Sequence, residues 1–105
     1  MDYTPVSTEE FSAESALADW RVIGAAAHAT FAAGGFSAAA ALLLAFAEAA
    51  DAADHHPDLD LRYPDLVHVV LSSHATGGVT RADVALAGQY STLASAAGAA
   101  PQPAD

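Results

Sequence analysis

The chain has 105 residues, of which 53% are hydrophobic, and this is enough for one domain with a packed core. Its three basic residues are outnumbered by 13 acidic ones, so the net charge is -10 at pH 7. Such a charge repels phosphate backbones and anionic lipids, and we therefore expect no nucleic-acid partner and no membrane partner. The absence of cysteine excludes a disulfide framework and a thiolate metal site.

Two features of the chain bear on its location. The first ten residues are acidic and lack the positive segment of a signal peptide. The longest apolar run, residues 36–47, is shorter than a bilayer span and is followed by Glu48. We expect a soluble cytoplasmic protein, with a single domain over residues 1–97 and a frayed tail over residues 98–105.

The first third of the chain predicts a helix followed by two short strands. Ser7 and Glu10 have the spacing of a capping box, which predicts a helix from Ser7 to about Asp19. Residues 20–23 have the composition of a short strand, and a glycine turn separates them from a second strand over residues 27–31.

The middle of the chain predicts a long helix and then a pair of strands. Residues 36–53 carry apolar side chains three or four positions apart, and the resulting stripe consists of Phe36, Ala39, Leu43, Phe46 and Ala50. Pro57 ends the helical pattern. Residues 58–63 and 66–74 alternate in the way that half-buried strands do. We expect the inward-facing side chains of these strands to be Leu59, Leu61, Tyr63, Val67, Val69 and Leu71.

The last predicted element is a helix that begins at Thr80, after a turn at two consecutive glycines. Asp83 has the position of the capping-box partner of Thr80. The complete order is α-β-β-α-β-β-α, which predicts an α+β fold with a four-stranded antiparallel sheet and three helices on one face. The uncovered face and the edges of such a sheet favour self-association.

Residues 51–83 contain four of the five histidines. His55 and His56 follow the predicted long helix, and His74 follows a predicted strand. If the helix reaches His55, Asp51 lies one turn before it and can orient its imidazole. An imidazole titrates near pH ~6.5, so two of them on opposite sides of a ligand can serve as general acid and general base.

The same residues have other interpretations. We expect His28 and His68 to be ordinary structural histidines. A metal site is disfavoured because His55 and His56 are adjacent and point to opposite sides in an extended chain, and the sequence has no His-x-His or His-x-x-x-His pair. A serine nucleophile is also disfavoured, since no serine lies in a Gly-x-Ser-x-Gly turn.

The spacing of these residues resembles a known family. The chain contains the pattern D-x-x-x-H-H-P, then an aromatic residue, a histidine, and an aspartate nine residues later, at Asp51, His55, His56, Pro57, Tyr63, His74 and Asp83. Residues 72–87, SSHATGGVTRADVALA, extend the match. The pattern is similar to that of the pterin-4a-carbinolamine dehydratases, and the resemblance runs from about Leu17 to about Leu93.

The resemblance implies the α-β-β-α-β-β-α fold that the pattern of elements also predicts, and it implies a dehydration reaction. The family removes water from 4a-hydroxytetrahydropterin to give quinonoid dihydropterin, in the recycling of tetrahydropterin for aromatic amino acid hydroxylation, without a metal or bound cofactor. By resemblance, His55 and His74 are the acid/base pair and His56 binds the pterin. Asp51 then supports His55, and Asp83 lines the site while capping its helix.

One departure and two alternatives accompany this resemblance. Ten residues separate Tyr63 from His74, one more than is usual in the family, and a bulge at residues 64–66 would absorb the extra residue. The alternatives are a non-catalytic interaction or assembly protein and a pterin-binding module without turnover. The retained histidines and carboxylates favour the enzyme, and the resemblance implies a homodimer or homotetramer.

Overall fold

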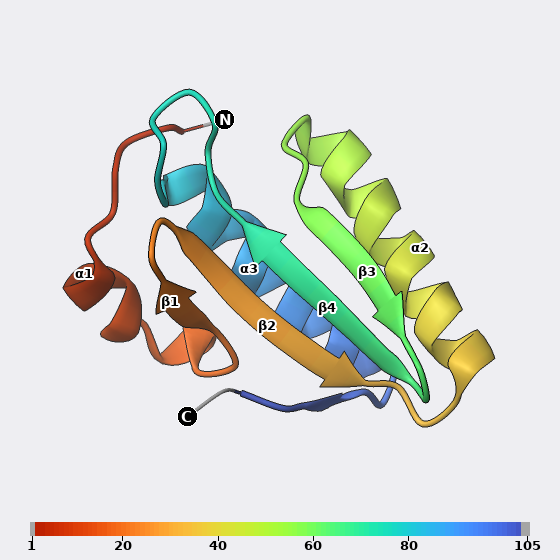
Figure 1. Cartoon of the computed structure of the whole chain (residues 1–105). Helices are drawn as coiled ribbons and strands as arrows, with labels where there is room; N and C mark the ends of the chain where they lie inside the picture. Colours follow the sequence, from red (N-terminus) through yellow and green to blue (C-terminus); the bar gives the residue numbers. More distant parts are fainter. Residues whose placement is uncertain (1, 104–105) are drawn as a thin grey trace.

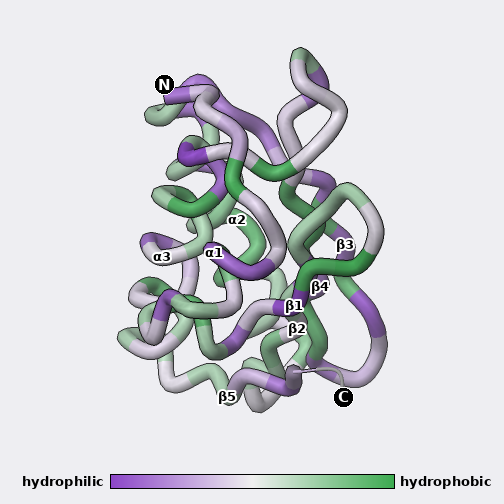
Figure 2. Tube along the Cα trace, turned by 90° about the vertical axis from the view of Figure 1, so that its left-hand side faces the viewer, coloured by the Kyte–Doolittle hydropathy of each residue, from purple (hydrophilic) through white to green (hydrophobic). Residues whose placement is uncertain are grey.

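The structure, a computed structural model, describes residues 2–103. Helices α2 and α3 cover one face of an antiparallel sheet, and Figure 2 shows helices and strands as two layers. The predicted α+β fold is confirmed. The elements are α1 (Thr8–Ser12), the 3-10 helix η1 (Ser15–Leu17), β1 (Arg21–Ile23), β2 (Ala26–Ala32), α2 (Phe36–Ala53), β3 (Asp58–Arg62), β4 (Leu66–Leu71), α3 (Arg81–Ala96) and β5 (Ala100–Pro101).

The sheet has the strand order β1-β2-β4-β3, and each neighbouring pair is antiparallel. Val69 of β4 lies opposite Ala29 of β2 on one side and Leu59 of β3 on the other. Because side chains alternate along a strand, the residues of β4 that face the helices are fully buried, as predicted: Val67, Val69 and Leu71. Strand β4, which lies between β2 and β3, leads directly into the segment that carries His74.

Helix α2 occupies the residues predicted for it and buries a stripe made of Ala39, Leu42, Phe46, Ala49 and Ala50. Its first residue, Phe36, is 53% exposed, so its predicted place in the buried stripe is wrong. By length and composition alone α2 could cross a membrane, but its stripe belongs to the core under the sheet. Tyr90 of α3 stacks on Phe46 and donates its hydroxyl to the Phe46 carbonyl at 2.8 Å, which locks the two helices together.

The predicted first helix is shorter than expected. The capping box is confirmed, since the Glu10 N–H donates to Oγ of Ser7 at 3.1 Å. The helix then ends at Ser12, and a separate 3-10 turn begins after the extended Glu14. In one continuous helix, Phe11 and Leu17 would lie about 120° apart around the axis. The break allows both side chains to enter the core, where they are 2% and 4% exposed. Helix α1 lies beside β1 (Figure 1).

The chain after α3 is ordered against the sheet, so the predicted frayed tail is wrong for residues 99–102. Gly98 has a φ of 74°, in the left-handed region, and turns the chain back from the helix. Strand β5 then pairs with β2, and the N–H of Gln102 donates to the Thr30 carbonyl at 2.8 Å. Residues 104–105 of the predicted tail lie outside the described residues.

The predicted bulge at residues 64–66 is absent from the hairpin that joins β3 and β4. Arg62 pairs with Leu66, so the hairpin loop consists of residues 63–65, and β4 pairs regularly with both of its neighbours. Tyr63 lies in this loop and is 88% exposed, so its predicted inward direction is also wrong. Strand β4 therefore keeps one register with each neighbour as far as Leu71, after which the segment that carries His74 begins.

Candidate active site

The segment after α2 places two adjacent histidines in different environments. Asp54 ends α2 in the left-handed conformation, with φ 50° and ψ 41°. The N–H of His55 still bonds to the Ala50 carbonyl at 3.2 Å, so the chain turns sharply at the end of the helix. As a result, His55 is buried at 7% exposure, whereas His56 is 58% exposed. The two rings therefore differ sharply in burial, and their predicted opposite directions stay a prediction.

His55 is paired with a buried carboxylate. Nε2 of His55 lies 2.6 Å from Oδ1 of Asp83, and Asp83 has no exposed surface. The carboxylate oxygens only accept hydrogen bonds, so Nε2 of His55 carries a hydrogen and donates it. Nδ1 of His55 has no hydrogen-bond partner within residues 2–103, and no side-chain nitrogen or oxygen of this described part is both buried and unpaired. Nδ1 therefore reaches solvent, and it is the nitrogen that holds the lone pair whenever the ring is uncharged.

Asp83 is fixed by a network at the start of α3. Its Oδ2 accepts the backbone N–H of Thr80 at 2.8 Å and the hydroxyl of Ser73 at 3.0 Å. The hydroxyls of Ser73 and Thr80 are 2.7 Å apart. The predicted capping box of Thr80 and Asp83 is confirmed. A carboxylate at a helix N-terminus is also stabilised by the helix dipole. The network holds Asp83, and through it the ring of His55, in one orientation.

Three of the predicted histidines meet at a cleft of about 280 Å³. Its lining consists of Tyr3, Asp54, His55, His56, Ser73, His74 and Ala75. Figure 1 shows why they meet: the loop after α2, the loop after β4 and the N-terminal segment lie at the same end of the sheet. His74 is exposed at the start of the turn that the Ser73–Gly78 bridge closes. Tyr3 is a site residue that the sequence reasoning missed.

Asp51 contacts a different histidine from the one predicted. Its Oδ1 lies 3.0 Å from Nε2 of His56, and it does not line the cleft. The predicted support of His55 by Asp51 is wrong, because α2 ends before His55 and the left-handed Asp54 turns that ring away from the helix face. Asp83 supports His55 in its place.

The remaining two histidines form a cluster on the helix-free face of the sheet. Nδ1 of His28 lies 3.3 Å from Nε2 of His68, whose Nδ1 lies 3.1 Å from Oδ2 of Asp60. Partial burial lowers the pKa of His28, and the charge of His68 lowers it further. Burial opposes the ionisation of Asp60, but hydrogen bonds from Arg62 and His68 outweigh it and lower the pKa of that carboxyl. None of these side chains lines the histidine cleft.

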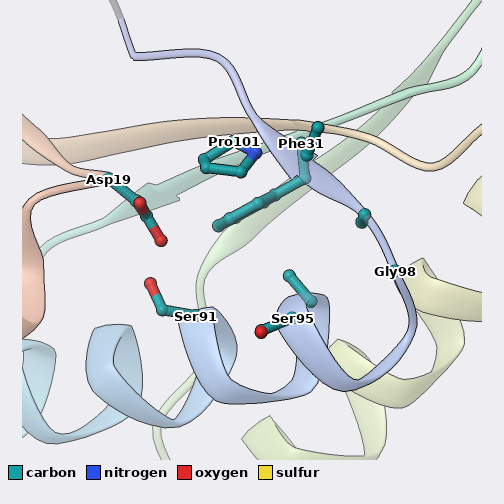
Figure 3. A pocket seen from close by; sticks show the side chains of 9 residues that line it. Asp19, Phe31, Ser91, Ser95, Gly98 and Pro101 are labelled. Carbon is teal, nitrogen blue, oxygen red and sulfur yellow. The ribbon is translucent and has the colours of Figure 1, made fainter.

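A second cavity, of about 460 Å³, lies between α3 and β5 (Figure 3). Asp19 and Ser91 point toward each other across it, with Phe31 and Pro101 on the far side. It has one carboxylate and no histidine, so it is unsuited to paired acid/base chemistry. Within residues 2–103, no three histidine, aspartate or glutamate side chains are grouped as metal ligands.

Comparisons with known proteins identify the family of the chain. The chain matches the family model for pterin 4 alpha carbinolamine dehydratase over residues 4–93. Two proteins named "Putative pterin-4-alpha-carbinolamine dehydratase" are similar to it: one from Nocardia farcinica is 45% identical over 74% of this chain and 81% of its own, and one from Thermomicrobium roseum is 41% identical over 72% and 81%. The crystal structure of a transcriptional coactivator/pterin dehydratase from Brucella melitensis has a TM-score of 0.75 at 26% identity, covering 87% of this chain and 99% of that one. The chain belongs to the pterin-4-alpha-carbinolamine dehydratase family.

Proposed function

We propose that this protein dehydrates a 4a-hydroxytetrahydropterin to a quinonoid dihydropterin, with His55 and His74 as its acid/base pair. The observation that carries the proposal is the buried pair of His55 and Asp83 beside a cleft that His74 and His56 also line. Membership of the family supports dehydratase chemistry. The proposed setting is the recycling of tetrahydropterin after aromatic hydroxylation.

The proposed reaction requires one proton to leave N5 of the pterin and another to reach the departing 4a-hydroxyl. His55 is suited to accept the first proton, because Asp83 holds Nε2 as a donor and leaves the lone pair on Nδ1. The positive charge that forms on the ring then lies beside the Asp83 carboxylate. Together these features make His55 the general base of the proposal.

His74 is assigned the complementary role of general acid. Its side chain is exposed at the cleft and makes no side-chain hydrogen bond within residues 2–103, so its ring can turn toward a bound hydroxyl. His56, held by Asp51 at the rim, is assigned to substrate binding. Positioned acid/base groups contribute roughly 10²–10⁴-fold each, so loss of either histidine should be easy to measure.

A non-catalytic interaction protein is the alternative, and the Brucella melitensis protein is named a transcriptional coactivator as well as a pterin dehydratase. The intact pair of His55 and Asp83 favours the enzyme, because a binding surface has no need of a buried histidine with a fixed tautomer. The test is turnover of freshly generated 4a-hydroxytetrahydropterin, followed by absorbance above the spontaneous rate. A dehydration rate above the spontaneous rate would support the proposal, and a rate equal to the spontaneous one would refute it.

A further inference from the structure

We infer that Tyr3, on the N-terminal arm, is a substrate-positioning residue that forms an aromatic wall of the histidine cleft. The inference rests on the proposed function of that cleft and extends it to a residue outside the motif. The family match begins at residue 4, so Tyr3 lies just before the part of the chain that the family model covers.

The arm, residues 2–6, is held against the start of α3 by backbone hydrogen bonds. The N–H of Val6 donates to the Val79 carbonyl at 3.0 Å. The N–H groups of Arg81 and Ala82 donate to the carbonyls of Thr4 at 2.9 Å and Asp2 at 2.7 Å. Arg81 and Ala82 are the first two residues of α3, and such N–H groups have no partner within their own helix. The arm satisfies them and is thereby anchored at the start of α3.

This pairing places the ring of Tyr3 at the mouth of the cleft. Its centroid lies 5.8 Å from that of His55, with an interplanar angle of 63°, which is an edge-to-face contact. The side chain is 43% exposed and lines the cleft. Its hydroxyl makes no hydrogen bond within residues 2–103. A half-exposed aromatic ring on a backbone-anchored arm, beside the proposed base, is suited to contact a ligand.

The aromatic ring of Tyr3 indicates which kind of ligand the cleft can hold. Among the described residues that line the cleft, Tyr3 is the one aromatic side chain besides the histidines. The bicyclic pterin of the proposed reaction can pack a face of its pyrimidinone ring against such a side chain, and the contact limits how its reacting edge turns relative to His55. The contact is made equally before and during the reaction, so its loss should raise KM more than it lowers kcat.

The test compares Tyr3→Ala, Tyr3→Phe and Thr4→Ala in the full chain. Thr4 is a matched control, because it lies on the same arm, is exposed, and bonds through its backbone. We expect Tyr3→Ala to raise KM by about 3- to 10-fold with kcat little changed. Tyr3→Phe should retain most of the affinity, and Thr4→Ala should retain all of it. Thermal unfolding of each variant reports whether the arm stays in place.

A second readout is the affinity for 7,8-dihydropterin, measured by titration without turnover. A parallel loss of affinity in Tyr3→Ala, restored in Tyr3→Phe, supports the inference. Wild-type KM and affinity in Tyr3→Ala would overturn it. Absence of turnover in the wild type would overturn the proposed function alone, since the dihydropterin affinities still decide the role of Tyr3. A wild type that binds no dihydropterin would overturn both.

Discussion

Replacing Asp83 with asparagine should reduce turnover far more than it reduces stability. The side chain of Asp83 accepts hydrogen bonds from three residues, His55, Thr80 and Ser73. An asparagine has one carbonyl oxygen and one NH₂ group. Its oxygen can keep the two donors at Oδ2, and its NH₂ group then faces Nε2 of His55. The ring must accept at Nε2 and carry its hydrogen on Nδ1, which removes the lone pair from the nitrogen assigned as base.

The size of each effect follows from these contacts. In a serine protease, the equivalent change of a carboxylate that orients a catalytic histidine costs about 10⁴-fold in kcat. General acid/base catalysis contributes roughly 10²–10⁴-fold, so we expect Asp83→Asn to lower kcat by about 10²-fold or more. The free energy of unfolding should fall by about 1.5–3 kcal/mol, the scale of one hydrogen bond to a charged group. Asp83→Ala should cost about 3–5 kcal/mol, because three donors lose their partner.

The assay measures kcat per folded molecule, with the folded fraction taken from urea unfolding of the same preparation. Asp60→Asn is the matched control, since Asp60 also accepts a hydrogen bond from a histidine but lies on the helix-free face of the sheet. It should leave kcat unchanged. If Asp83→Asn turns over at the wild-type rate once the folded fraction is corrected, Asp83 acts only as a helix cap and the tautomer argument is refuted.

Two further predictions concern stability and assembly. The folded pKa of His28 lies below its unfolded value of ~6.5, so the unfolded chain binds the proton first, and the free energy of unfolding should fall as the pH drops from 7 to 5. In His28→Gln, the free energy of unfolding measured with urea should depend less on pH in that range. A dependence equal to that of the wild type would contradict the lowered pKa of His28. The charge-bearing groups that lie next to His28 are His68 and, on β1, Arg21. The uncovered sheet face and the exposed Phe36 and Leu44 of α2 predict at least a homodimer at micromolar concentration. Light scattering that detects only monomer would refute the assembly prediction.

The parts of the fold that were predictable from the sequence depend on local signals. The ends of α2 follow from the two glycines before it and from Pro57 after it, and the buried face of β4 follows from its alternation. The early end of α1 was not predictable, because it depends on where Phe11 and Leu17 meet the core. The pairing of β5 with β2 was also missed, since its short apolar sequence has no periodicity to detect.

The candidate site, like the fold, was predictable from the sequence only in part. The motif pointed to His55, His56 and His74, which lie at one cleft, and to Asp83, which bonds to His55. It did not show which carboxylate bonds to His55, since that depends on the backbone angle at one residue, Asp54. Tyr3 was missed because its place beside His55 comes from backbone pairing between segments far apart in the sequence, and backbone pairing leaves no side-chain pattern.

The most direct measurement of the central claim is the dehydration rate of His55→Ala and His74→Ala beside the wild type and His28→Gln. His28 is the control because it lies in the cluster outside the cleft. We expect each cleft variant to lose at least an order of magnitude in kcat, within the range of a single acid/base group, while His28→Gln stays at the wild-type rate at pH 7. Wild-type rates in both cleft variants, at matched folded fraction, would refute the assignment of His55 and His74 as the acid/base pair.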